Sequence, residues 1–189
     1  MATIYERLDD KLSKFIRAQK MFFVATAPIS GDGNVNLSPK GYDSLAFLDD
    51  RTLAWIDLGG SGVETMAHVR ENGRITLMWC AFEGRPNILR VYGKGEIIAF
   101  DDPRFDDLLP LFPTFERARS IVVVRIHRIA DACGWGVPLM EFKGEREQLR
   151  RYVDHRPEDE WREHRYQKNA ASIDGLPGLV RHQPPLAAE

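Results

Sequence analysis

Hydrophobic and polar residues follow a helical period at the start of the chain and change to the period of strands near residue 21. In the first segment apolar residues recur at helical spacing between charged residues, at Ile4, Leu8, Leu12, Phe15 and Ile16. Side chains with this spacing lie on one face of a helix. We therefore expect an amphipathic helix that covers one end of the core.

The next hundred or so positions alternate between short apolar, β-branched runs and turn-forming clusters. Clusters at 31–34, 49–51 and 83–87 each separate two such runs, which is the pattern of a hairpin. One short helix is expected at 63–72, ended by an Asn-Gly pair. The predicted strands cover 21–28, 35–38, 44–48, 52–57, 74–82, 89–100 and 120–129.

Hairpin-linked strands with one intervening helix indicate a mainly β (α+β) fold. Because closure of the sheet removes exposed edges, we expect an antiparallel β-barrel of about six to seven strands with a few flanking helices. Between the last two strands, residues 105–117 predict short helices broken by Pro110 and Pro113.

The C-terminal part of the chain differs in composition from the barrel. Residues 145–165 form a charged helical region, and 167–189 a loop rich in Gly and Pro, in which we expect no fixed structure from Arg181 onward. We divide the chain into a barrel domain, 1–145, and a helical extension with its tail, 146–189. The extension is expected to dock on the same domain or on a partner subunit.

Charge and composition narrow the function classes. The 189 residues carry 26 basic and 28 acidic side chains, mixed along the chain, with a net charge of −2. No broad basic face is available for nucleic acid, and no apolar run is long enough to span a bilayer. A cytoplasmic protein without a secretory signal is expected, and in that reducing compartment Cys80 and Cys133 should be free thiols.

The sharpest local feature is the segment from Asp57 to Thr65, in which a strand runs through a glycine-rich turn into a helix. Glycines allow close approach of the backbone, and the first N–H groups of a helix lack internal partners, so a phosphate finds donors here. The alternative is a capping box, with Ser61 as N-cap and Glu64 three residues later. From the residues alone both interpretations stay open.

Two cations and the histidines complete the candidates. Lys40, at the end of the second predicted strand, could place a point charge on a phosphate or be merely exposed. Arg90, inside an apolar strand, needs an anionic partner. The five histidines show no spacing typical of a metal site, so no metal is expected.

Four stretches follow one another along the chain: MFFVATAP, NVNLSPKGYD, LAWIDLGGSGVETMAHVRENGRITLMW and ILRVYGKGEII. In this order they resemble the pyridoxamine 5'-phosphate oxidase-related family of FMN-binding split barrels, over about residues 15–130. Two later stretches, 133–138 and 168–178, are similar to one subgroup of that family without an assigned substrate. The resemblance implies an antiparallel split β-barrel.

It also implies a homodimer with FMN in a groove shared by two subunits. Lys40 and the 61–65 turn would hold the phosphate, Ser38 and Pro39 would run beside the flavin, and Trp135 would cover the ring from the partner chain. Arg90 lies on a strand that contacts the cofactor in relatives. The cofactor-binding residues implied in this way are Ser38, Pro39, Lys40, Asp57, Ser61, Gly62, Thr65, Arg90 and Trp135.

The chain departs from the vitamin-forming oxidases at two places. Glu64-Thr65 stands where they carry an adjacent Arg-Lys pair, and their Arg-x-His substrate motif has no counterpart in matching context. We therefore expect an FMN-dependent oxidoreductase with another small substrate, NAD(P)H as a possible donor, and no assigned catalytic side chain. The alternatives are a flavin-binding sensor or carrier without turnover, and haem or deazaflavin bound in the same barrel through His68 or His127.

Overall fold

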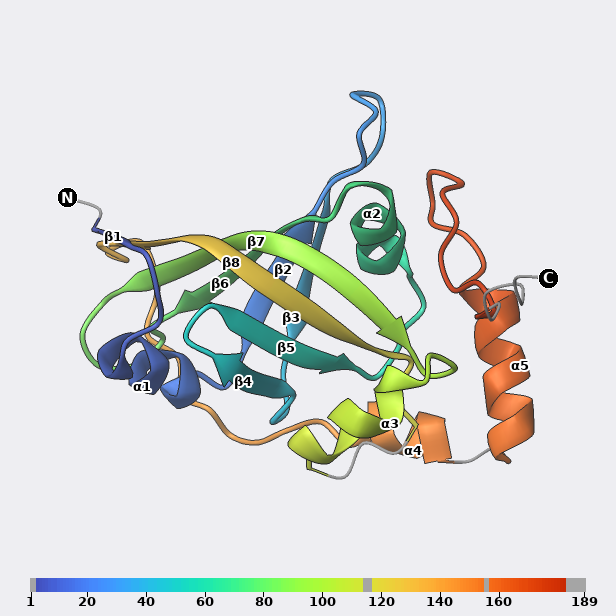
Figure 1. The fold of residues 1–189 in the computed structure, drawn as a ribbon. Helices are drawn as coiled ribbons and strands as arrows, with labels where there is room; N and C mark the ends of the chain where they lie inside the picture. Colours follow the sequence, from blue (N-terminus) through green and yellow to red (C-terminus); the bar gives the residue numbers. More distant parts are fainter. Residues whose placement is uncertain (1–2, 114–116, 155–156, 183–189) are drawn as a thin grey trace.

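The computed structural model describes residues 3–113, 117–154 and 157–182 and shows one curled antiparallel sheet with helices around it (Figure 1). Within these residues the strands are β1 (Ile4–Tyr5), β2 (Phe22–Thr26), β3 (Asn36–Lys40), β4 (Leu45–Asp49), β5 (Thr52–Asp57), β6 (Arg74–Cys80), β7 (Ile88–Ala99) and β8 (Ser120–Ala132). The helices are α1 (Asp10–Ala18), α2 (Glu64–Asn72), α3 (Arg104–Leu108), the 3₁₀ turn Leu109–Leu111, α4 (Gln148–Asp154) and α5 (Glu158–Lys168).

The strands pair in the order β3-β2-β6-β7-β8-β5-β4, all antiparallel, and β1 adds to β8. β3 and β4 are the two ends of this order, yet residues 41–44 connect them directly, so the sheet must curl to bring its ends near each other. The barrel is split between them, because no pairing joins β3 to β4 in the described chain. The mainly β, antiparallel split barrel predicted from the sequence is confirmed.

The inside of the barrel is filled by large apolar side chains. Phe22, Trp55 and Trp79 pack together, with the Phe22 ring stacked on Trp79 at 5.6 Å between centroids. Leu12 and Ile16 of α1 belong to the same buried cluster, so α1 covers one end of the barrel as expected.

A second core lies on the outer face of β5 and β8. Successive residues of β5 serve the two cores in turn: Leu53 and Trp55 point inward, whereas Ala54 and Ile56 join the outer cluster. The outer cluster also contains Trp161 of α5 and Leu179 from the segment after it. The C-terminal extension is therefore packed on the barrel of its own chain.

Two boundaries differ from the expectation. Ile4, expected on the first helix, lies in β1 opposite Ala130, and α1 begins only at Asp10, because the Asp9 carboxylate accepts a hydrogen bond from Leu12 N and caps the helix there. Arg181, expected to lack fixed structure, packs its guanidinium over the Tyr166 ring and pairs with Glu163. The rest of that expectation, residues 183–189, lies outside the described residues.

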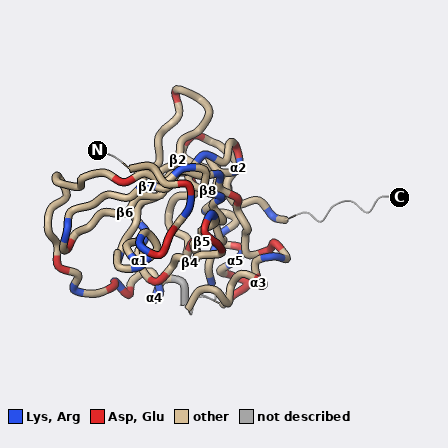
Figure 2. The backbone as a smooth tube through the Cα atoms, turned by 60° about the vertical axis from the view of Figure 1, so that its left-hand side comes forward, with Lys and Arg blue, Asp and Glu red and all other residues tan. Residues whose placement is uncertain are grey.

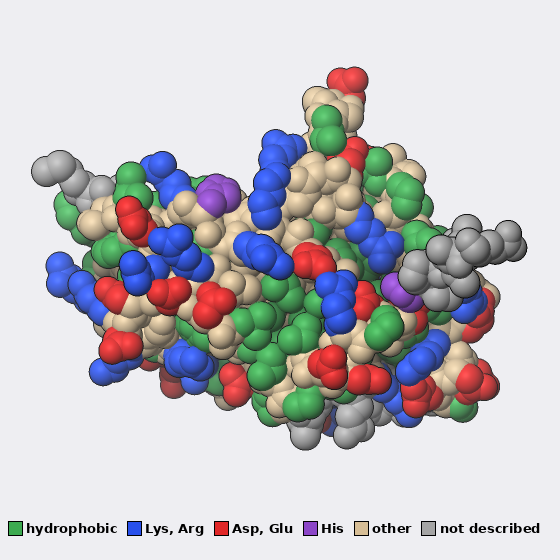
Figure 3. Space-filling view, viewed as in Figure 1, with side chains coloured by type: hydrophobic (Ala, Val, Ile, Leu, Met, Phe, Trp, Pro, Cys, Tyr) green, Lys and Arg blue, Asp and Glu red, His purple; other side chains and the backbone are tan. Residues whose placement is uncertain are grey.

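The distribution of charged residues and the state of the two cysteines agree with the expectations from the sequence. Basic and acidic residues are scattered over the whole backbone (Figure 2), and on the face shown in Figure 3 both signs are interspersed around a central group of hydrophobic side chains. Among the described helices none combines the length and apolar character needed to cross a membrane. Cys80 and Cys133 are both free, the first buried and the second exposed.

Candidate functional site

The glycine-rich junction between β5 and α2 is a loop without a side-chain cap. α2 begins at Glu64, its N-cap is Val63, and no side chain accepts a hydrogen bond there. Ser61 is exposed and lies two residues too early to cap, so the capping-box alternative is wrong. The helix does end as predicted, with Gly73 in the left-handed conformation at φ 70°.

The Glu64 side chain folds back over the loop. Its carboxylate lies so close to Gly62 that a Cβ added at Gly62 would clash with it. A carboxylate at this position interacts favourably with the positive end of the helix dipole. The start of α2 therefore carries an anion of the chain's own.

A buried ion pair supports the loop from below. Arg119, just before β8, places Nη2 2.6 Å from Oδ2 of Asp57, and both side chains are almost completely buried. Burial alone would raise the pKa of Asp57, but the charges of Arg119 and Lys40, together with hydrogen bonds from Arg119 and Gly59 N–H, hold it well below the ordinary value. Asp57 is thus a carboxylate at every physiological pH.

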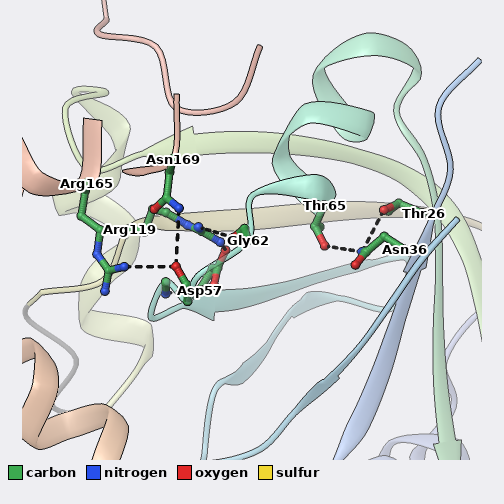
Figure 4. Close-up of polar contacts among 10 residues, drawn as sticks. Thr26, Asn36, Asp57, Gly62, Thr65, Arg119, Arg165 and Asn169 are labelled. Atoms are coloured by element: carbon green, nitrogen blue, oxygen red, sulfur yellow. Dashed lines mark hydrogen bonds and ion pairs between the residues drawn. The ribbon is translucent and has the colours of Figure 1, made fainter. Parts of the chain in front are cut away.

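Three side chains donate hydrogen bonds to the carbonyl groups of the loop (Figure 4). Arg119 Nη1 donates to Gly62 O at 2.7 Å, while Arg165 Nη1 and Asn169 Nδ2 donate to Gly60 O at 3.3 and 3.4 Å. Arg165 and Asn169 come from α5 and the residue that follows it. The loop is held between the barrel and the C-terminal extension.

Beside this loop lies a pocket of about 230 Å³. Lys40 from β3 and the backbone of Gly59 and Gly60 line it, with Tyr42 and Leu149 on the other sides. Lys40 is half-buried and close enough to Asp57 to lower the pKa of that carboxyl. The structure thus brings Lys40, Asp57 and the loop together, and Arg119 and Lys40 offset the negative charge of Asp57.

Thr65 belongs to a second polar group, on the other side of α2's first turn (Figure 4). Asn36 Nδ2 donates to Thr65 Oγ1 at 2.9 Å and to Thr26 Oγ1 at 3.1 Å, and Thr26 Oγ1 lies 3.1 Å from His68 Nδ1. Thr65 and His68 are both buried. The Thr65 hydroxyl oxygen therefore already accepts a hydrogen bond from its own chain.

Of the other residues implied by the resemblance, Pro39 lines this pocket beside Lys40, whereas Ser38, Arg90 and Trp135 are not among its lining residues. Pro39 and Arg90 share one outward-facing row across the sheet, because the register aligns Pro39 with Phe23, Phe23 with Met78 and Met78 with Arg90. Ser38 takes the opposite, inward face, and its buried Oγ has no hydrogen-bond partner within the described structure. Trp135 is 83% exposed beyond the end of β8.

Comparison with known proteins bears directly on the family. The model of the pyridoxamine 5'-phosphate oxidase family matches residues 8–133, more than half of the chain. The chain belongs to the pyridoxamine 5'-phosphate oxidase family. Among curated proteins, this oxidase-family chain is 35% identical over 196 residues to the pyridoxamine 5'-phosphate oxidase family protein ustO of Aspergillus flavus, covering 95% of the chain and 78% of ustO.

Solved structures share the fold of this oxidase-family chain at low identity. HupZ of Group A Streptococcus matches with a TM-score of 0.51 and 19% identity over 71% of the chain and 99% of HupZ. A Lactobacillus delbrueckii protein described as a candidate pyridoxamine 5'-phosphate oxidase matches with a TM-score of 0.50 and 18% identity over 65% of the chain and 93% of its own length. At this identity the likeness concerns the fold alone.

The sequence had not revealed three residues of the site in this oxidase-family chain. Arg119 precedes a strand without a motif, and Arg165 and Asn169 lie in and just after a helix whose mixed charges are typical of a solvated face. One signal was available: Trp161 and Arg165 are four residues apart and share the buried face of α5. The tail similarity at 168–178 likewise included Asn169.

Proposed function

We propose that this chain binds FMN between two subunits and acts as a flavin-dependent oxidoreductase on a small molecule. Family membership supports the cofactor class, and the single observation that carries the proposal is the pocket at the glycine-rich loop. There Lys40 adds a cation, and Arg119 and Arg165 occupy the loop carbonyls.

The residues present fit a phosphate group. In a trans peptide the carbonyl of one residue and the N–H of the next point in opposite directions. With Gly60 O and Gly62 O turned toward guanidinium groups, the N–H groups of Ser61 and Val63 are turned away from them. In this proposal the Ser61 and Val63 amides, which follow the pocket-lining Gly59 and Gly60 in the chain, act together with Lys40 as donors to the anion.

The size of the pocket favours a shared groove. About 230 Å³ is below the ~300–1,000 Å³ usual for sites that enclose an organic ligand, so one protomer has room here for the phosphate end only. The outward row that contains Pro39, Phe23, Met78 and Arg90 offers the adjoining surface, and Leu37 on the same face is 63% exposed. A second copy on that face completes the site in this proposal.

In this mechanism FMN supplies the redox chemistry when bound. Lys40 and the loop amides bind and orient the phosphate, and Asp57, fixed by Arg119, keeps β5 and the loop at a constant spacing. Arg90, from the outward row, provides a positive charge beside the flavin of the shared groove. The lack, in matching context, of the Arg-x-His motif of the vitamin-forming enzymes favours another small-molecule substrate in this proposal.

The purified protein tests the proposal. We expect a yellow protein, or a colourless one that quenches the fluorescence of added FMN at one flavin per subunit. Oxidation of NADH or NADPH by that preparation distinguishes an enzyme from a flavin-binding module without turnover. A chain that binds no FMN under any of these conditions, or that carries haem instead, overturns the proposal.

A further inference from the structure

The C-terminal extension contacts the loop of the proposed phosphate pocket at several points. Besides the two hydrogen bonds to Gly60 O, Arg70 of α2 donates to Gly178 O at 2.7 Å. Gly178 itself packs against Val63, where an added Cβ would lie 2.6 Å from Val63 Cγ1. The loop and the start of α2 are thus fastened to residues more than 100 positions later in the sequence.

Arg165 is the contact of the C-terminal extension whose burial is energetically unfavourable. Its side chain is 2% exposed, and Nε and Nη2 have no hydrogen-bond partner among the described residues. Burial lowers the pKa of Arg165, and the neighbouring charge of Arg119 lowers it further. The guanidinium does lie near the Trp161 and Tyr152 rings, but burying two nitrogens without hydrogen-bond partners destabilises the fold relative to an apolar side chain of the same size. Its presence therefore needs a reason other than packing.

The position of the guanidinium supplies the reason. It lies over Gly59, which has φ +77°, and a Cβ there would approach Arg165 Cζ to 3.0 Å. From this place Arg165 reaches Gly60 O and, with Asn169, holds that carbonyl on the side of α5. The following N–H group, of Ser61, is thereby held on the opposite side, where Ser61 is exposed.

We propose that Arg165, assisted by Asn169, is a positioning residue for the phosphate site: it fixes the Gly60 peptide so that the loop amide faces the anion. This inference rests on the proposed function. It makes the C-terminal extension part of the determinants of flavin affinity.

The test compares FMN with riboflavin, which lacks the phosphate, on the full chain. In Arg165→Met the dissociation constant for FMN should rise about tenfold, the size of one lost hydrogen bond to a charged group, with little change for riboflavin. Arg165→Lys, which keeps one donor and the charge, should recover part of the loss. The matched control is Arg162→Met on the same helix, whose guanidinium pairs with the exposed Glu158 and lies over the Phe100 ring, away from the loop, and it should change neither constant.

The outcomes separate this inference from the function on which it rests. If the unaltered protein binds neither flavin, the proposed function fails. If it prefers FMN and Arg165→Met lowers both affinities equally, or neither, the positioning role is refuted while FMN binding stands. Should Arg165→Met not fold, Asn169→Ala removes the second donor to Gly60 O, and a loss for FMN alone is again expected.

Discussion

Arg119 and Asp57 form an ion pair that is closed off from water, with Nη2 and Oδ2 2.6 Å apart and side-chain exposures of 3% and 6%. The backbone repeats the contact, since Arg119 N donates to Asp57 O at 2.7 Å. The pair links the end of β5 to the start of β8 directly beneath the glycine-rich loop. Several consequences can be measured.

Removal of one partner leaves the other charge buried and unpaired. We expect Arg119→Met to lower the free energy of unfolding by about 3–5 kcal/mol, measured by urea denaturation. The double variant Asp57→Leu/Arg119→Met should recover a large part of this loss, because no charge is then left without a partner. A loss below 1 kcal/mol in the single variant would contradict the burial of the pair. Arg7→Met, from an exposed pair with Asp50, is the control.

The same carboxylate gives a pH dependence with a definite sign. Because the pKa of Asp57 is lower in the folded protein than its ordinary value of 3.8, its contribution is complete above that value and is lost as the pH falls below about 4. The difference in stability between the unaltered protein and Asp57→Asn should therefore be constant from pH 7 to 5 and shrink below pH 4. Thermal unfolding across that range, followed by circular dichroism, measures it. A difference that grows on acidification would be the opposite result.

Adjacent glycines of the loop provide a matched pair of variants. Gly59 has φ +77° and no room for a Cβ beside Arg165, whereas Gly60 has nothing within 4 Å of an added Cβ. Gly59→Ala should cost more than about 1 kcal/mol of stability, and Gly60→Ala much less. Equal melting temperatures for the two variants would contradict this prediction and show that the Arg165 guanidinium moves aside without loss of stability.

Charges on the two sides of the loop should act in opposite directions on the cofactor. Lys40→Ala should weaken the binding of FMN much more than the binding of riboflavin, because only FMN carries the phosphate anion. Glu64→Gln should strengthen FMN about two- to fivefold, since its carboxylate occupies the start of α2. Flavin fluorescence titrations measure both. Equal changes in the affinities for FMN and riboflavin would show that the phosphate does not bind beside Lys40 and Glu64.

The outward face of β3 offers a test of the proposed dimer. Leu37 is 63% exposed in one protomer, so Leu37→Asp should leave the stability of the protomer within about 0.5 kcal/mol. In a dimer formed on this face the new carboxylate would be buried in the interface. The variant should therefore sediment as a monomer in sedimentation velocity and bind FMN more weakly. Leu111→Asp, 48% exposed on the 3₁₀ turn, is the control that should remain associated. An unaltered protein that sediments as a monomer would refute the shared groove.

The hairpins were predictable from sequence because their signals are local. Turn clusters such as Gly31–Asn34 and the alternation along β5 depend on neighbouring residues, and the structure reproduces them within a few positions. Ile4 was assigned to a helix because its spacing from Leu8 suits one. In the structure the Asp9 carboxylate caps the helix, so the helix begins after Ile4. Ile4 instead pairs with Ala130 of β8, 126 residues away.

The site was less predictable because its partners are distant in sequence. The glycine turn indicated an anion site, but its support comes from Arg119 and Arg165, 57 and 105 residues from the loop residues they contact. Nothing local distinguishes Arg119 from an exposed arginine, and only the spacing of four residues from Trp161 distinguishes Arg165. Only the packing of α5 against the barrel, driven by Trp161, turns Arg165 toward Gly60.

The outer core has a consequence for synthesis of the protein. Ala54 and Ile56 are synthesised first, whereas Trp161 and Leu179, which cover the same cluster, follow more than 100 residues later. Until then a nascent barrel exposes the apolar outer face of β5 and β8, the kind of surface that chaperones bind and that promotes aggregation. The tail is therefore the segment on which the yield of correctly folded chains depends.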